Sequence, residues 1–262
     1  QQISMPLFAI PQIRVGIVKS TTIIFAFNGD YRCQQTGALV TGEHTCEWDN
    51  NHIKWNGQSF EQLNFIPQHE VNEFVLANVR IGIDFHWERE ESQSFRGTLE
   101  LQATDHAIQV VNGVDIETYL ESVISSEMSA NASTDLLKAH AIVSRSWLMH
   151  PLLHMPSALS TFDNDHKEWI KWYERDAHVG FDVCADDHCQ RYQGITRART
   201  ENVRLAIEAT RGMVLMNNGE ICDARFSKSC GGVSEVFENC WADVHYPYLE
   251  RVIDSQQSTV NS

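Results

Sequence analysis

The sequence is poor in positive charge. Its 262 residues include 20 Lys and Arg against 35 Asp and Glu, so the formal net charge is −15. Proteins that bind nucleic acid neutralise phosphates with Lys and Arg, and the same cations attract anionic membranes. The composition therefore argues against nucleic acid as a partner and against tight binding to anionic membranes, although it leaves room for a local basic groove.

Long apolar runs are missing as well. No stretch approaches the roughly 18 apolar residues that a transmembrane helix needs, and no signal peptide is visible at Gln1. Hydrophobic residues make up 42% of the chain and aromatic residues 10%, which is not the composition of a disordered chain. We expect a folded chain of one large or two small domains without a membrane span.

Cysteine is present in an odd number. Seven cysteines lie at positions 33, 46, 184, 189, 222, 230 and 240, so at least one should be unpaired within the chain. Cys33 and Cys46 could form a disulfide or remain two buried thiols. One disulfide could form among the last three cysteines.

The first 110 residues are typical of β-structure. Alternating apolar residues predict a strand from Gln12 to Phe27, and Asn28–Asp30 predicts a turn into a partner strand. Asn56-Gly57 predicts a second hairpin. No motif in this part points to chemistry, so we interpret it as a scaffold.

Residues 115–149 predict two helices joined by a short polar turn. The first has an apolar stripe at the spacing of one helical face, made of Ile116, Tyr119, Leu120, Val123 and Ile124. Glu127 lies within about 20° of Ile116 on the helical wheel. A carboxylate in line with this stripe would be desolvated and suited to proton transfer near neutral pH. The alternative is a Glu at the helix end that reaches solvent.

The second helix has a start signal and a pair of cations. Ser133 can cap it, and Asp135 lies in the first turn, where a negative charge suits the helix dipole. Lys138 and Arg145 are seven residues apart and share one side of the helix. They could hold an anionic ligand or steer Glu127; the alternative is two solvated charges.

Two cysteines and two histidines gather within twelve residues, at His178, Cys184, His188 and Cys189. Imidazole and thiolate are the ligands that tetrahedral zinc prefers. The alternatives are a Cys184–Cys189 disulfide and free thiols. Before this cluster, the aromatic run from Lys167 to Glu174 predicts a helix whose rings could line a glycan groove or pack in a core.

These segments together resemble the SpoIID/LytB family, which comprises the stage II sporulation protein D and the amidase-enhancer proteins. The matching residues include VN at 111–112, E-x-YL at 117–120, EM at 127–128, LKA at 137–139, Arg145, FDVC-x₄-CQ-x-Y-x-G at 181–194, ATRG at 209–212 and Ser229 before the glycine pair at 231–232. Three places depart from the family's pattern: Ser129 stands in place of Pro, His140 in place of the Gln of LKAQA, and Arg145-Ser146-Trp147 in place of Arg-Thr-Tyr.

The resemblance implies an exported lytic transglycosylase that cuts the glycan strands of bacterial peptidoglycan. It implies Glu127 as the catalytic acid/base. Lys138 and Arg145 would then orient Glu127 or bind substrate groups. Ser229, which matches the second Ser of the family's pattern, would bind substrate; the alternative is a Ser that only satisfies a turn. It also implies a zinc ion on His178, Cys184 and Cys189, with water or His188 as the fourth ligand, although the chemistry itself requires no metal. Peptidoglycan would be the partner, together with a cell-wall amidase, and the location would be the periplasm or cell envelope.

The competing interpretation is a non-catalytic amidase enhancer or peptidoglycan-binding protein, for which Ser129 and His140 leave room. A third is a zinc hydrolase centred on Cys184 and Cys189. For the fold, we expect an α+β chain: a β-rich N-terminal part (1–92), a SpoIID-like catalytic core with the helical segment and a returning hairpin at Asn218-Gly219 (93–254), and a polar tail (255–262).

Overall fold

The fold is α+β, as predicted. It is seen in a computed structural model that describes residues 10–82, 86, 89–129, 132–153, 178–186, 188–196, 200–227 and 230–253. These residues divide into two compact units. The sheet unit contains the described residues up to Ala141 and from 178 to Arg211, and the C-terminal unit contains those from Ile142 to 153 and from Gly212 to 253.

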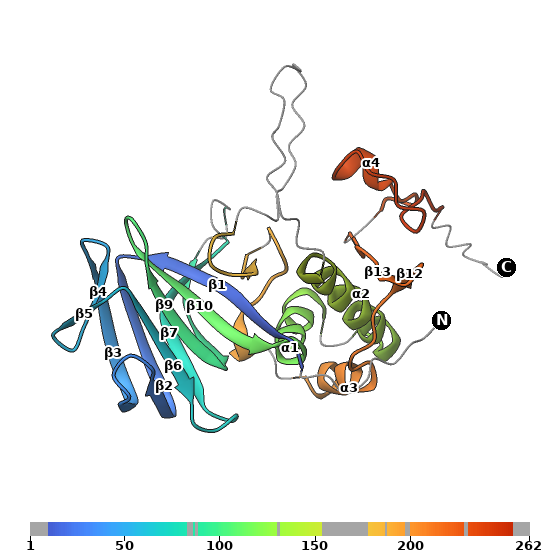
Figure 1. The fold of residues 1–262 in the computed structure, drawn as a ribbon. Helices are drawn as coiled ribbons and strands as arrows, with labels where there is room; N and C mark the ends of the chain where they lie inside the picture. The colour runs from blue at the N-terminus through green and yellow to red at the C-terminus, as the bar shows by residue number, and fades with distance from the viewer. Residues whose placement is uncertain are drawn as a thin grey trace, which may run out of the picture. The chain divides into compact units, whose positions relative to one another are not determined.

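One 11-stranded sheet forms most of the sheet unit (Figure 1). Its strand order is β11-β1-β10-β9-β6-β2-β3-β4-β5, and β7 pairs with β2 and with β8. β11 runs parallel to β1, whereas the other pairs are antiparallel. The strands are β1 (Gln12–Ser20), β2 (Thr22–Cys33), β3 (Leu39–Asp49), β4 (His52–Trp55), β5 (Gln58–Phe60), β6 (Gln62–Pro67), β7 (Glu73–Ile81), β8 (Arg89–Arg96), β9 (Thr98–Ala103), β10 (Ile108–Asp115) and β11 (Val183–Cys184). The domain boundary that the sequence predicts after residue 92 falls within β8.

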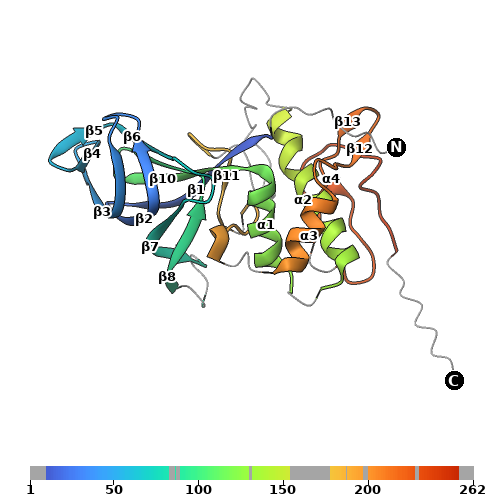
Figure 2. The same ribbon diagram turned by 90° about the horizontal axis from the view of Figure 1, so that it is seen from below.

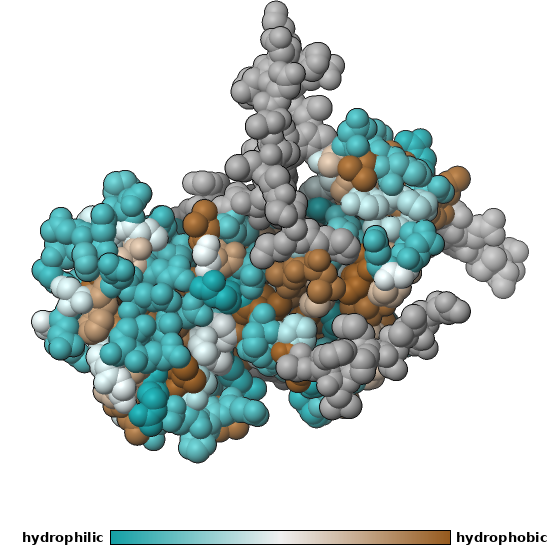
Figure 3. All heavy atoms as spheres, viewed as in Figure 1, coloured by the Kyte–Doolittle hydropathy of each residue, from teal (hydrophilic) through white to brown (hydrophobic). Residues whose placement is uncertain are grey.

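Aromatic rings on alternate positions of these strands fill the core, while the surface over the strands is mostly hydrophilic (Figure 3). On β2 the rings of Phe27 and Tyr31 stack with centroids 4.2 Å apart. Cys33 and Cys46 lie in this core as two buried thiols, and burial raises the pKa of Cys46 to about 12.

The predicted turn at Asn28–Asp30 is wrong, because β2 runs straight through these residues. The register between β2 and β3 shifts here, which marks a β-bulge. Gly29 takes a φ of +109°, and a Cβ at this position would lie 2.6 Å from the side chain of Asn72. The Asn72 amide donates to the Asp30 carbonyl at 2.8 Å. Gly29 therefore lets the Asn72 side chain approach the backbone of β2 closely, and it does not form a turn.

The two predicted helices are α1 (Ile116–Glu127) and α2 (Thr134–Leu153). Asp115, at the end of β10, caps α1 by accepting the backbone N–H groups of Glu117 and Thr118, both at 3.0 Å. Ser133 caps α2 as expected, since its hydroxyl accepts the N–H of Leu136 at 3.3 Å. The division between the two units falls inside α2, after Ala141. Among the described helices, none combines the length and apolar character that a membrane crossing requires.

Short elements complete both units. In the sheet unit, η2 (Gly194–Thr196) is followed by α3 (Glu201–Ala209), which lies beside α1 (Figure 2). In the C-terminal unit, β12 (Met216–Asn217) and β13 (Glu220–Ile221) precede α4 (Phe237–Cys240). The hairpin turns predicted at Asn56-Gly57 and Asn218-Gly219 are both present, with the positive φ values that such turns need.

Candidate active site and metal centre

Glu127 is the last residue of α1 and is held from two sides. The apolar stripe before it is buried, as predicted, but the Glu127 side chain keeps 21% of its surface exposed. Its Oε1 accepts the backbone N–H of Arg191 at 3.2 Å. Its Oε2 lies 3.0 Å from Nε2 of His140, whose side chain is only 3% exposed. The carboxylate is therefore oriented by α2 and by the segment around residue 191 while still reaching solvent.

Neither contact of Glu127 was apparent in the sequence. His140 stood out only as a departure from the LKAQA pattern, and Arg191 belongs to a stretch of chain 64 residues away. A helical-wheel argument places residues on one helix and cannot show which residue of another segment faces them. The tertiary structure supplies this information, because it brings His140 of α2 and the backbone of Arg191 to the end of α1.

Residues 190–193 are fastened to the base of α1 and to β10. The Tyr119 hydroxyl donates to the Gln190 side chain at 3.2 Å. The Tyr192 hydroxyl donates to Oδ1 of Asn112 at 2.6 Å. The rings of Tyr119 and Tyr192 stack with centroids 5.1 Å apart. Four side chains from the motifs that carry the family resemblance thus anchor the segment that contacts Glu127. We call these hydrogen bonds and the ring stack the 190–193 fasteners.

Asn112 and Gly194 anchor the same segment to the strands of the sheet. The Asn112 amide donates to the carbonyls of Arg96 and Thr98 at 2.8 and 2.9 Å, and its side chain is fully buried. Gly194 has a φ of +59°, and a Cβ there would lie 2.1 Å from the Ser94 carbonyl oxygen. Only glycine fits this close approach of the two backbones.

The predicted Cys/His cluster is assembled. One ligand atom from each of His178, Cys184, His188 and Cys189 lies within 4.8 Å of the others. His178 Nε2 is 3.2 Å from the Cys189 sulfur, and His188 Nδ1 is 3.5 Å from Cys189 and 3.8 Å from Cys184. No disulfide joins Cys184 to Cys189.

These spacings fit a tetrahedral zinc ion. Typical zinc bond lengths to nitrogen and sulfur place neighbouring ligand atoms about 3.3–3.8 Å apart at the corners of a tetrahedron. Hydrogen bonding to the Cys189 sulfur, and secondarily to the Asp186 backbone and His188, lowers the pKa of the Cys184 thiol to about 5, against the opposing effect of burial. A thiolate at neutral pH is the form that binds a metal.

The sheet edge holds Cys184 in place. β11 pairs with β1, with Gly16 opposite Cys184. The Ala185 N–H donates to the Gly16 carbonyl at 2.9 Å. The Phe181 ring covers Gly16 so closely that a Cβ there would lie 2.6 Å from it. The candidate metal centre is therefore anchored to the sheet through β11 and to α1 through residues 190–193.

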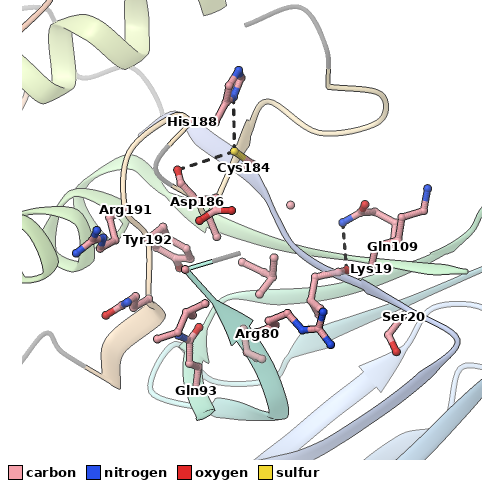
Figure 4. A pocket seen from close by; sticks show the side chains of 18 of the residues that line it. Lys19, Ser20, Arg80, Gln93, Gln109, Cys184, Asp186, His188, Arg191 and Tyr192 are labelled. Atoms are coloured by element: carbon pink, nitrogen blue, oxygen red, sulfur yellow. Dashed lines mark hydrogen bonds between the residues drawn. The ribbon is translucent and has the colours of Figure 1, made fainter. Parts of the chain in front are cut away.

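A cavity of about 640 Å³ borders the cluster (Figure 4). His178, Cys184 and His188 line it, and Arg191 lies at its border as well. Polar side chains from the sheet face the same space, among them Lys19, Arg80, Gln93 and Gln109. Glu127 is not one of its lining residues. Arg191 links the cavity to Glu127, because it lines the cavity and its backbone N–H donates to the Glu127 carboxylate.

The predicted substrate-binding residues have different surroundings. Lys138 is half-buried on the part of α2 that belongs to the sheet unit. Arg145 belongs to the C-terminal unit and is only 2% exposed, so the interpretation of a solvated charge is wrong for it. Its guanidinium donates to the Met213 carbonyl at 3.0 Å. Ser229 and the predicted aromatic helix at 167–174 lie outside the described residues.

Comparison with known proteins finds one family match. Residues 104–217 match the family model SpoIID, described as Stage II sporulation protein. The matched range includes Glu127, His140 and the Cys/His cluster. The family is associated with the degradation of cell-wall peptidoglycan.

Three relatives are similar to this chain. The chain is 22% identical to the Stage II sporulation protein D of Bacillus subtilis, over 56% of this chain and 40% of that protein. It is 27% identical to an uncharacterised protein of Brachyspira hyodysenteriae, over 59% of this chain and 36% of that protein. An uncharacterised protein of Chlamydia pneumoniae is 24% identical over 92% of this chain and 82% of its own length. The chain thus spans well under half of the first two relatives and most of the third.

Proposed function

We propose that this chain is a lytic transglycosylase that cleaves the glycan strands of peptidoglycan with Glu127 as its single acid/base. One observation carries the proposal: Glu127 ends α1 with a partly exposed carboxylate that Arg191 and His140 orient. It does so within the segment that matches the SpoIID family. An oriented carboxylate that still reaches solvent can meet a substrate.

The proposed reaction needs one carboxylate rather than the pair that ordinary glycosidases use. Glu127 gives its proton to the oxygen between N-acetylmuramic acid and N-acetylglucosamine, and the bond from that oxygen to the muramic C1 breaks. The muramic C6 hydroxyl then bonds to C1 and returns its proton to the Glu127 carboxylate. The products are a 1,6-anhydro-muramic end and a new N-acetylglucosamine end, and no water is consumed.

We further propose that His178, Cys184, His188 and Cys189 hold a zinc ion with a structural role. Zinc bound there would cross-link the segment from 178 to 189 without supplying a group that the reaction requires. Arg191, two residues beyond the last ligand, contacts Glu127 through its N–H. The four side chains would thus keep the segment in the position where this hydrogen bond forms.

The remaining assignments are part of the same proposal. Lys138, half-buried near the start of α2, would bind acidic or N-acetyl groups of the glycan. The assignments of Arg145 and Ser229 to substrate binding stay predictions. Because the substrate lies outside the cytoplasm, we propose a location in the periplasm or cell envelope, with a cell-wall amidase as a candidate partner.

Digestion of peptidoglycan, with and without its stem peptides, tests the proposal by mass spectrometry. We expect anhydro-muramic ends from the wild type and none from Glu127→Gln. Glu121→Gln is the matched control, because Glu121 is a half-buried carboxylate on the same helix. Reducing ends would instead indicate a hydrolase with a second carboxylate. If the wild type gives no product while a known lytic enzyme does, the transglycosylase proposal is wrong, and co-sedimentation with peptidoglycan would then test the binding role.

A further inference from the structure

We propose that the cavity beside the Cys/His cluster binds an extended peptide with an acidic side chain, supplied by a partner protein. The peptide adds as a strand to the sheet, at a place where two strand edges are open. The cavity has a volume of about 640 Å³, which lies within the range typical of ligand pockets. Binding of this peptide does not depend on the chemistry of Glu127.

The cavity lies between β1 and β7, which approach one another without pairing. Residues 16–20 of β1 and 78–82 at the end of β7 line it. In the part of the chain that the structure describes, residues 17–20 pair with β10 only, because the pairing with β11 stops at Gly16. Residues 79–81 likewise pair with β8 only, because β2 pairs with β7 no further than Leu76. Both strands therefore have an open edge that borders the cavity.

An open strand edge is a row of backbone donors and acceptors. The N–H and C=O groups of a strand point to both of its sides, so pairing on one side leaves groups on the other side for another chain. β11 already uses the first part of this edge of β1, where the Ala185 N–H donates to the Gly16 carbonyl at 2.9 Å. Residues 17–20 continue the edge beyond β11. They match an extended peptide of about four residues, at about 3.3 Å per residue.

The open edge of β1 has two features that keep other sheets away. A bulge interrupts its pairing with β10 between Gly16 and Val18, and the exposed Lys19 lies on it. Bulges and lysines on edge strands prevent sheets from pairing edge to edge. Because β7 also borders the cavity, the site suits one separate extended segment and not the edge of another sheet.

The charge of the lining favours an acidic peptide. The whole chain has 35 acidic against 20 basic residues. The cavity reverses this balance, with three cations against two carboxylates: Lys19, Arg80 and Arg191, and Glu90 and Asp186. Lys19 and Arg80 lie at the end away from Cys184 and His188 (Figure 4). Arg80 and Glu90 are 3.9 Å apart with both side chains 55% exposed, and such surface pairs are weak. A carboxylate of the peptide can therefore bind at this end.

A sugar fits the same cavity less well. Sugar rings stack on open aromatic faces, and the two aromatic side chains of Phe181 and Tyr192 that line the cavity are already covered. The Phe181 ring packs over Gly16 and lies 4.9 Å from the His178 ring, measured between centroids. Tyr192 is 2% exposed and stacks on Tyr119. The cavity thus offers backbone groups and charge and not an aromatic platform.

Selection from a phage-displayed library of random seven-residue peptides, on the full immobilised chain, tests the proposal. The selected peptides should share an acidic residue, and their synthetic copies should slow hydrogen exchange of amides within residues 17–20 or 79–81. The Lys19→Glu, Arg80→Glu double variant should bind them about 10-fold or more weakly, with an unchanged Tm because both side chains are exposed. Lys54→Glu is the matched control, an exposed lysine on β4 outside the cavity, and should bind within about twofold of the wild type.

Several results would overturn the proposal. These are no enrichment of peptides on the wild type over the double variant, protection of amides elsewhere, or equal affinity after the charge reversal. Protection of the same amides by a glycan oligomer and by no peptide would indicate a glycan site instead. If the double variant has a lower Tm, Lys19→Ala and Arg80→Ala repeat the comparison singly.

Cleavage of peptidoglycan is a separate readout, because neither Lys19 nor Arg80 contacts Glu127. An inactive wild type that binds the selected peptides would overturn the transglycosylase and leave the peptide site standing. An active wild type that binds no peptide would overturn the peptide site and leave the transglycosylase standing.

Discussion

Two buried tyrosine hydroxyls in the sheet unit should respond in opposite ways to the same change. Tyr192 is 2% exposed, and its hydroxyl donates to the buried Asn112 at 2.6 Å. Tyr31 is fully buried, yet its hydroxyl has no hydrogen-bond partner among the residues that the structure describes. Replacing either tyrosine with phenylalanine removes one oxygen atom and leaves the ring in place.

The structure sets the sign and size of each effect. In Tyr192→Phe, Oδ1 of Asn112 loses its donor in a site without solvent, which should lower the free energy of unfolding by about 1–3 kcal/mol. In Tyr31→Phe, a hydroxyl that is buried without a partner disappears. Burial of such a group costs about 1–3 kcal/mol, so this variant should be as stable as the wild type or more stable.

Urea denaturation of both variants, read as changes in the midpoint at constant m, measures these differences. Native-state hydrogen exchange adds a local readout, since Tyr192→Phe should speed exchange of the Arg191 amide, which the 190–193 fasteners hold against Glu127. Equal effects of the two substitutions, or a Tyr192→Phe variant within 0.5 kcal/mol of the wild type, would refute the assignment of Tyr192 and Asn112 as fasteners.

Three further predictions follow from the same unit. Elemental analysis should find zinc in the purified wild type and none in the Cys184→Ser, Cys189→Ser double variant. The Tm of the double variant should be lower than that of the wild type by on the order of 5 °C or more. A wild type that contains no zinc and has the same Tm as the double variant would contradict this prediction. Gly194→Ala should lower the free energy of unfolding by about 2–4 kcal/mol, measured in urea, because its φ is +59° and its Cβ would clash with the Ser94 carbonyl. Burial raises the pKa of Cys46 from 9.0 to about 12, so the folded state keeps a proton that the unfolded state loses. This contribution is complete well below pH 9. Above pH 9 it should decline by about 1.4 kcal/mol per pH unit until about pH 12, relative to Cys46→Ala; parallel curves for the two proteins would refute it.

Local patterns were sufficient for the elements of the site. The apolar stripe predicted α1, and Ser133 as a cap predicted the start of α2, because helix signals lie in neighbours three and four residues apart. The Asn-Gly pairs predicted two hairpins because their positive φ values suit that turn. The same reasoning failed at Asn28–Asp30, where Gly29 serves a bulge against Asn72. A glycine signals an unusual backbone conformation, and its neighbours in space decide which one.

The sequence by itself determined the α+β class, the helix that ends at Glu127, and the Cys/His spacing that suits a metal, since each depends on residues close together in the chain. Only the tertiary structure showed that His140 and Arg191 orient Glu127 and that Arg145 is buried rather than solvated. It also showed that Asn112 and Tyr192 anchor the segment that follows the Cys/His cluster to the sheet. These contacts join segments far apart in the chain. They arise from the packing of helices and strands, which no periodicity within one segment encodes.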